Sequence, residues 1–403
     1  MTDIGISVED LPNLASPQLN TRIVFATDEW FAEAPNMLKD EPAIFDENTF
    51  TEYGKEMDGW ESRRRRTEGH DWSIIQLGTP GIIEAIEIDT LWFTGNFSPR
   101  ASVSAMYYEK EKLPSAVDKL LQMRAEVIES RGEKSSHGRQ GTCATEGEMA
   151  AAQSLNSDKW TELVPLQPLG AGYPKSSRNL FRVSAKDQRF NFLRLSMGPD
   201  GGIARLRVYG RISISPESIP RNREVDLASV TIGALALGAS NSHYGHPRNL
   251  CNPGRGKVMG DGWETARQPK RPSAYERGKD GLMVLPGFDW AVLQLGIPGI
   301  IKRVEVDTHL YKGNYPESCL IEGCYKPGGK SADLALDENK AEIGWQIILP
   351  RTRLRAHEIH RFDIEGVANS IPITHVKLTI YPDGGVQRLR VFGFPATQPQ
   401  SKL

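Results

Sequence analysis

One long stretch of this chain occurs twice, and the duplication limits the possible fold more than any other feature. Asp71–Phe97 aligns without gaps with Asp289–Tyr315, and 14 of the 27 positions are identical. A second stretch, Pro199–Gly210, matches Pro382–Gly393 at nine of twelve positions. We therefore expect two similar structural units, and any interpretation of function has to account for both copies.

The length of 403 residues also favours two units, because a single hydrophobic core rarely serves more than about 300 residues. The predicted segments are a flexible N-terminal arm over 1–12, a first repeat over 13–212, a linker over 213–222, a second repeat over 223–395 and a flexible tail over 396–403. The first repeat carries an insertion over 112–157 that the second lacks. Apolar residues at helical spacing predict a helix at Lys112–Ile128, and the polar remainder of the insertion is expected to be mobile.

Short apolar runs between Gly- and Pro-containing turns dominate both repeats. Trp72–Leu77 and Ile82–Ile88 are predicted to be two strands separated by a Gly-Thr-Pro-Gly turn. The repeated Pro-Asp-Gly-Gly is typical of a tight turn. Almost no helical pattern occurs outside the insertion. These patterns predict an all-β protein made of two tandem antiparallel β-sandwiches, with a helical insertion in the first.

Composition excludes several classes of partner. The formal net charge of −2 argues against a general nucleic-acid-binding protein, which usually has a basic surplus. No apolar run approaches the ~20 residues that span a bilayer, and the N-terminus lacks the pattern of a signal peptide. The four cysteines form no C-x-x-C pair, which fits a reducing compartment. We therefore expect no nucleic-acid and no membrane partner.

The last three residues, Ser401, Lys402 and Leu403, match a peroxisomal targeting signal. They follow a Pro-containing segment that is expected to expose them. The sequence thus predicts a peroxisomal location with the import receptor as a partner, and a cytoplasmic location is the alternative.

Four motifs occur in the same order in both copies: Asp-Gly-Trp-Glu, then Asp-Trp with Leu-Gly-x-Pro-Gly-Ile-Ile, then Asp-Thr with Gly-Asn, then Pro-Asp-Gly-Gly-x-x-Arg-Leu-Arg-Val. This combination resembles the allantoicase family over residues 12–395. The resemblance implies two jelly-roll β-sandwiches, an architecture shared with discoidin-type and galactose-binding modules. It also implies hydrolysis of allantoate to ureidoglycolate and urea in purine breakdown, without an organic cofactor, and we expect a homo-oligomer. The alternative is a non-catalytic β-sandwich that binds a sugar or another small ligand.

Allantoate is a carboxylate whose central carbon carries two ureido groups. Its hydrolysis requires a cation for the carboxylate, for which the planar fork of Arg is well suited, and groups that move protons to urea and from water. The run Arg63–Arg66 follows the first Asp-Gly-Trp-Glu motif, although such a run can also be a solvated basic loop. The predicted substrate-binding residues are Arg63, Arg64, Arg267, Trp60, Trp263, Asn96 and Asn314.

Four side chains are the predicted acid or base catalysts. Glu61 and Glu264 follow the repeated Trp in a Gly-containing loop, where function often lies on such scaffolds; capping of backbone N–H groups is the alternative. His70 and His309 each occur in one copy only, as expected if one member of a pair has specialised. A structural histidine is the alternative for both.

The sequence predicts no metal site and no cofactor. The pairs His243/His246 and His357/His360 are closely spaced, but neither pair recurs in the other copy and neither has zincin spacing. The repeated Arg205 and Arg388 admit a structural interpretation, ion pairing with Asp200 or Asp383.

Overall fold

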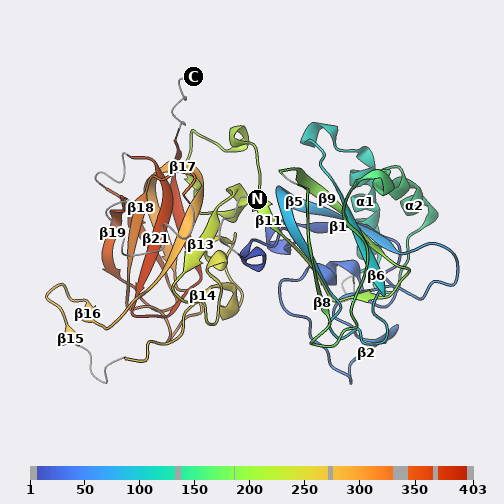
Figure 1. Ribbon diagram of the computed structural model, residues 1–403, viewed down its shortest axis with the longest axis horizontal. Helices are drawn as coiled ribbons and strands as arrows, with labels where there is room; N and C mark the ends of the chain where they lie inside the picture. The colour runs from blue at the N-terminus through green and yellow to red at the C-terminus, as the bar shows by residue number, and fades with distance from the viewer. Residues whose placement is uncertain are drawn as a thin grey trace. The chain divides into compact units, whose positions relative to one another are not determined.

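The computed structural model describes residues 7–131, 138–185, 187–270, 276–329, 344–365 and 371–396. The chain divides into two compact units, Asn13–Ser213 and Ile214–Leu403, the second of which includes Met1–Pro12 (Figure 1). Each unit consists mainly of antiparallel strands. The prediction of a duplicated all-β fold with few helices is confirmed.

The first unit contains one seven-stranded sheet. Its strand order is β1-β5-β9-β6-β7, and β8 and β11 also pair with β5. The short strand β4 pairs with β10, and β2 pairs with β3. The strands are β1 (Arg22–Ala26), β2 (Phe50–Thr51), β3 (Gly54–Lys55), β4 (Trp60–Glu61), β5 (Trp72–Asp89), β6 (Arg100–Met106), β7 (Thr161–Pro168), β8 (Arg178–Arg182), β9 (Arg189–Met197), β10 (Gly202–Ile203) and β11 (Arg205–Ile212).

The second unit repeats this arrangement. Its large sheet has the order β12-β23-β17-β21-β18-β19, with β13 and β20 also on β17, and β14 pairs with β22 as β4 pairs with β10. The strands are β12 (Val225–Asp226), β13 (Leu235–Ala239), β14 (Trp263–Glu264), β15 (Glu276–Arg277), β16 (Met283–Val284), β17 (Asp289–Asp307), β18 (Ser318–Cys324), β19 (Gln346–Arg353), β20 (Ile359–Asp363), β21 (Ile373–Tyr381), β22 (Gly385–Val386) and β23 (Arg388–Pro395).

The helical segments are short apart from α1 (Ser115–Ser130) and α2 (Glu146–Gln153). The described 3-10 helices are η1 (Val8–Asp10), η2 (Pro17–Leu19), η3 (Ala34–Leu38), η4 (Lys110–Lys112), η5 (Ser157–Lys159), η6 (Pro216–Ser218), η7 (Val230–Ile232), η8 (Pro247–Cys251) and η9 (Met259–Asp261). None of the described helices is long and apolar enough to cross a membrane.

β5 is a single strand of 18 residues, so the prediction of two strands separated by a turn is wrong. Its first half pairs with β1 and β9, and its second half pairs with β11 and β8. The register with β9 skips from Gln76 to Gly81, where the strand bends. A Cβ on Gly78 would lie 1.8 Å from the carbonyl oxygen of Leu19. The glycines therefore permit close packing at a bend rather than a chain reversal.

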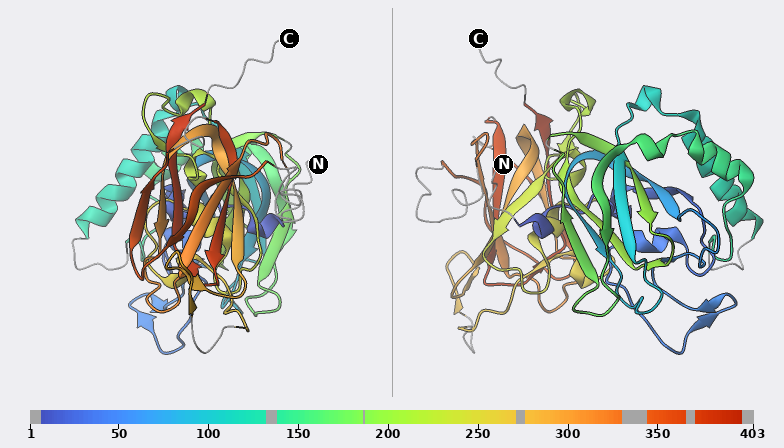
Figure 2. Two further views of the ribbon diagram at one scale, coloured as in Figure 1. Left: turned by 90° about the vertical axis from the view of Figure 1, so that its left-hand side faces the viewer. Right: turned by 45° about the vertical axis from the view of Figure 1, so that its right-hand side comes forward.

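The insertion covers one face of the first unit's sheet. Trp72 and Ile74 of β5 pack with Val117 and Leu120 of α1, and Figure 2 shows α1 and α2 running along this unit. The second part of the insertion was expected to be mobile, but residues 138–157 are ordered. α2 starts with a capping box in which Thr145 and Glu148 bond each other's backbone N–H groups.

Residues 7–12, the described part of the N-terminal arm, are also more ordered than predicted. Val8–Asp10 forms η1, Leu11 is buried, and Arg248 donates to the carbonyl oxygen of Glu9. The targeting residues Ser401, Lys402 and Leu403 lie outside the described residues.

Candidate active site

A glutamate and an asparagine from two different motifs meet in the first unit. Asn96 Nδ2 donates to Glu61 Oε1 at 2.6 Å. Glu61 lies opposite Gly202 in the β4–β10 pair, and the N–H of Gly202 donates to the carbonyl oxygen of Asn96 at 2.8 Å. Hydrogen bonds therefore join the Asp-Gly-Trp-Glu, Gly-Asn and Pro-Asp-Gly-Gly motifs to one another.

The second unit contains the same arrangement. Asn314 Nδ2 donates to Glu264 Oε1 at 2.5 Å. Glu264 lies opposite Gly385 in the β14–β22 pair, and the N–H of Gly385 donates to the carbonyl oxygen of Asn314 at 2.8 Å. Two predicted catalytic glutamates and two predicted substrate-binding asparagines are thus brought together, one pair in each repeat.

The glycines of the Pro-Asp-Gly-Gly motif allow this close approach. Gly201 has φ +123°, a conformation that favours glycine. A Cβ on Gly202 would lie 1.9 Å from the ring of Phe93, and one on Gly385 would lie 2.0 Å from the ring of Tyr311. Each asparagine loop therefore packs directly against the glycine backbone of the motif. This packing explains why the motif occurs in both repeats.

Glu61 has the properties of a proton-transfer group. Only 8% of the Glu61 surface is exposed to solvent. Burial raises the pKa of Glu61 to about 7, against the opposing effect of the Asn96 hydrogen bond. Among the described residues, Glu61 Oε2 has no hydrogen-bond partner. Glu264, in contrast, is only partly buried.

The predicted arginines divide into two kinds. Arg63 Nε donates to Asp28 Oδ2 at 2.7 Å, and the guanidinium lies 4.5 Å from the centre of the Trp30 ring. Arg64 and its counterpart Arg267 are exposed. Within the described ranges no hydrogen bond or ion pair holds either of these two side chains. Arg64 and Arg267 are therefore available to a ligand, whereas Arg63 is held by the protein.

Trp60 and Trp263 were predicted to contact substrate. This prediction is wrong, because both side chains are buried. Both residues are 0% exposed. Trp60 Nε1 donates to the carbonyl oxygen of Asp28, and Trp263 Nε1 donates to that of Asn241, each at 2.8 Å. These bonds satisfy the only polar group of each indole. Both tryptophans belong to the core.

Within the described ranges, neither predicted catalytic histidine is hydrogen-bonded to Glu61 or Glu264. His70 is exposed, and its Nε2 lies 3.3 Å from Arg194 Nη2. Desolvation, followed by the charges of Arg194 and Arg65, lowers the pKa of His70. Among the described residues, no hydrogen bond or ion pair joins His70 to Glu61.

His309 lies on the loop that carries Asn314. Its ring centre is 4.6 Å from that of His357, and its Nδ1 is buried without a hydrogen-bond partner. Desolvation and the nearby Arg255 lower the pKa of His309. In the described part of the chain, no contact joins His309 to Glu264.

Two aspartates that sequence reasoning considered only as ion-pair partners hold the loops in place. Asp200 Oδ2 accepts from the backbone N–H of Arg65 at 2.9 Å, and Asp383 Oδ2 accepts from that of Gln268 at 2.8 Å. The buried Arg205 pairs with Asp58 at 2.5 Å and not with Asp200. The repeated Pro-Asp-Gly-Gly motif was the available signal for the supporting role of both aspartates.

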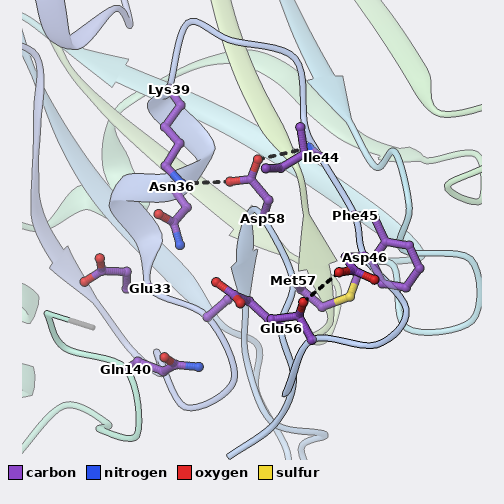
Figure 3. Close-up of a pocket in the computed structure, with 12 residues that line it drawn as sticks. Glu33, Asn36, Lys39, Ile44, Phe45, Asp46, Glu56, Met57, Asp58 and Gln140 are labelled. Atoms are coloured by element: carbon purple, nitrogen blue, oxygen red, sulfur yellow. Dashed lines mark hydrogen bonds and ion pairs between the residues drawn. The ribbon is translucent and has the colours of Figure 1, made fainter. Parts of the chain in front are cut away.

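A cavity of about 450 Å³ also lies in the first unit (Figure 3). Its lining includes the carboxylates of Glu33, Asp46, Glu56 and Asp58, with Lys39 as the one basic side chain. Lys39 is paired with Asp58 at 2.8 Å. This excess of acidic groups is unfavourable for an anionic ligand. Among the described residues, no group of three His, Cys, Asp or Glu side chains is arranged to hold a metal ion.

The fold and the site together define a duplicated β-sandwich protein with one carboxyl–amide pair in each repeat. The family model described as "Allantoicase repeat" matches residues 12–213 and 225–396. A probable allantoicase of Photobacterium profundum is 38% identical over 390 residues, which are 97% of this chain and 98% of the relative. One of Pseudomonas fluorescens is 36% identical over 98% of this chain and 99% of the relative.

A solved structure gives the same result. The crystal structure of allantoicase from Saccharomyces cerevisiae is 32% identical, with a TM-score of 0.65, and the match covers 95% of this chain and 93% of that one. The chain belongs to the allantoicase family. The predicted family is confirmed, and with it the prediction that the chain is an enzyme, a hydrolase.

Proposed function

We propose that the chain hydrolyses allantoate to ureidoglycolate and urea, with Glu61 of the first repeat as the acid and base. The observation that supports this most strongly is the buried Glu61 carboxyl, whose pKa lies near 7. A group with this pKa exchanges a proton readily at neutral pH. Family membership supports the substrate, and the geometry supports the residue.

The reaction at Glu61 has two steps. In the first, Oε2 of protonated Glu61 gives its proton to a ureido nitrogen of allantoate. The bond from that nitrogen to the central carbon breaks, the other ureido nitrogen forms a C=N bond, and urea leaves. In the second, the Glu61 carboxylate takes a proton from water as the water oxygen adds to the central carbon. The product is ureidoglycolate, and Glu61 is protonated again.

The neighbouring side chains have separate roles in this proposal. Asn96 Nδ2 donates to Oε1, so the proton is held on Oε2. The exposed guanidinium of Arg64 binds the substrate carboxylate by charge-assisted hydrogen bonds. In the second repeat, Glu264, Asn314 and Arg267 form the corresponding set, and His309 is a titratable group on the same loop.

Urea release from allantoate by the purified protein tests the proposal. Wild type should release urea, and Glu61→Gln should not. A wild-type protein that binds allantoate without releasing urea supports the binding-protein alternative. If Glu264→Gln abolishes urea release and Glu61→Gln does not, the reaction belongs to the second repeat.

We also propose import into peroxisomes through Ser401, Lys402 and Leu403. The sequence of these residues supports the proposal, whereas the bacterial relatives favour the cytoplasmic alternative. A fluorescent fusion with the tag at the N-terminus should localise to peroxisomes, and deletion of the three residues should release it into the cytoplasm. The expected homo-oligomer can be checked by light scattering of the purified protein.

A further inference from the structure

The insertion of the first repeat converges on one buried carboxylate, Glu29. Arg124 of α1 donates to both oxygens of Glu29, at 2.7 and 2.6 Å. Arg139, in the second part of the insertion, donates to Glu29 at 3.0 Å and pairs with Glu148 of α2 at 2.9 Å. All four residues are at most 8% exposed. Burial alone raises the pKa of Glu29, but the two guanidinium groups hold it below its usual value.

The segment that contains Glu29 also holds the strand of Glu61. The carbonyl oxygen of Asp28 accepts from Trp60 Nε1 at 2.8 Å, and its carboxylate accepts from the backbone N–H of Arg63 at 3.1 Å. Ala32 and Glu61 exchange two backbone hydrogen bonds of 3.2 and 3.1 Å. Residues 28–32 therefore connect the insertion to both sides of Glu61.

The second repeat lacks the insertion, and the segment equivalent to residues 28–32 bonds its glutamate strand in a different pattern. Asn241 replaces Asp28 and accepts from the backbone N–H of Ala266 at 2.8 Å. The carbonyl oxygen of Glu264 accepts from the backbone N–H groups of Tyr244 at 3.1 Å and Gly245 at 3.4 Å, and the N–H of Glu264 donates to Gly245 at 3.3 Å. Glu264 is also more exposed than Glu61. The copy with the insertion is thus the copy with the buried carboxyl.

We propose that Arg124 and Arg139 are positioning residues that keep Glu61 buried and make the first repeat the catalytic one. The inference rests on the proposed function of Glu61. Removal of one partner from a buried ion pair leaves an uncompensated charge, so Glu29 without Arg124 is driven toward water. Movement of Glu29 displaces residues 28–32, and water then reaches Glu61. The hydrated carboxyl loses its proton at neutral pH and no longer acts as an acid.

Arg124→Met tests this through the pH dependence of kcat/KM for allantoate. Loss of protonated Glu61 should move the alkaline limb at least about one pH unit lower, with about a tenfold loss of kcat/KM above pH 7. KM should change much less than kcat, because Arg124 does not contact substrate. Arg124→Lys keeps a cation beside Glu29 and should restore part of the activity and of the alkaline limb. If the Met variant does not fold, the Lys variant carries the test.

Val103→Ala is the control for general loss of stability, because Val103 is a fully buried core residue of β6. It should lower Tm without moving the alkaline limb. The proposal is overturned if Arg124→Met keeps the wild-type limb, or if Val103→Ala moves the limb equally. If Glu61→Gln retains full activity, the proposed function fails first; if Glu61→Gln is inactive and Arg124→Met behaves like wild type, only the positioning role fails.

Discussion

The side-chain amide of Asn96 lies 2.6 Å from the carboxyl oxygen Oε1 of Glu61 and donates a hydrogen bond to it. The two residues are 35 positions apart and come from different motifs. Their counterparts Asn314 and Glu264 make the same bond in the second repeat. The bond occupies one carboxyl oxygen and leaves Oε2 of Glu61 for a reacting proton.

Replacement of Glu61 by Gln should remove the reacting proton and leave the shape of the site unchanged. Gln Oε1 can still accept from Asn96 Nδ2, so we expect a folded protein. Loss of a general acid–base group costs typically about 10²–10⁴-fold, and kcat should fall by this order. Steady-state urea release measures the loss, and circular dichroism checks the fold. A fall of less than about tenfold would rule out Glu61 as the main acid–base group.

The pH dependence of kcat/KM should follow the protonated form of Glu61. Since the first step needs the proton, activity should be constant below the pKa of about 7 and fall as pH rises through it. The alkaline limb should be absent from the residual activity of Glu61→Gln. Rates between pH 5 and 9, measured with allantoate below KM, test this. An acidic limb near pH 7, with activity rising toward high pH, would assign Glu61 as a base in the first step.

The same carboxyl should make stability depend on pH. The pKa of Glu61 is raised from 4.5 to about 7 in the folded protein, so folding favours the protonated form. The resulting destabilisation is absent below pH 4.5, grows between pH 4.5 and 7, and is complete above pH 7. It amounts to at most about 3–4 kcal/mol, since a pKa difference of one is worth 1.36 kcal/mol.

Glu61→Gln, which cannot ionise, should therefore be more stable than wild type at pH 8 and similar to it at pH 4. Urea denaturation at the two pH values measures the difference. A stability difference that does not change with pH would mean that the carboxyl is not buried in its charged state.

Glu61 and Asn96 could each be selected as site candidates from sequence because both residues belong to motifs that occur twice, but the hydrogen bond between them could not be predicted. The buried position of Trp60 could not be predicted. The local sequence does not distinguish a tryptophan in an exposed loop from one in a two-residue strand that packs into the core. The 18-residue strand β5 was missed for a related reason. Gly and Pro mark both turns and bends, and only the packing of Gly78 against Leu19 distinguishes them.

The order of the insertion also depends on contacts that are distant in sequence. Arg139 is ordered by Glu29, which lies 110 positions earlier. Its neighbours are polar and small, which locally predicts mobility. A single sequence contains no record of such a pairing, so neither the order of residues 138–157 nor their link to Glu61 could be inferred from it.

The neighbouring arginines Arg63 and Arg64 should respond differently to substitution by Ala. Arg64 is exposed and held by no described residue, so Arg64→Ala should raise KM by about tenfold or more through loss of a charge-assisted hydrogen bond, with unchanged Tm. Arg63 bonds Asp28 and covers Trp30, so Arg63→Ala should lower Tm. Kinetics and thermal unfolding of both variants test the distinction. An unchanged KM for Arg64→Ala would contradict its role in binding the carboxylate.

Gly202 and Gly385 offer a matched comparison of the two repeats. A Cβ on Gly202 would lie 1.9 Å from the ring of Phe93, and a Cβ on Gly385 would lie 2.0 Å from the ring of Tyr311. Either Ala substitution should force a ring to move at a cost of about 1–3 kcal/mol, and Tm should fall in both variants.

Their effects on urea release should differ. The loop displaced by Gly202→Ala carries Asn96, whose carbonyl oxygen accepts a hydrogen bond from the Gly202 N–H. The kcat of this variant should therefore fall. Gly385→Ala disturbs the equivalent loop of Asn314 and should keep most of the activity, because the first repeat is intact. Equal losses of kcat in the two variants would show that both repeats take part in the reaction. Wild-type kcat in Gly202→Ala, together with the lowered Tm, would show that the Asn96 loop supports the fold but not the chemistry.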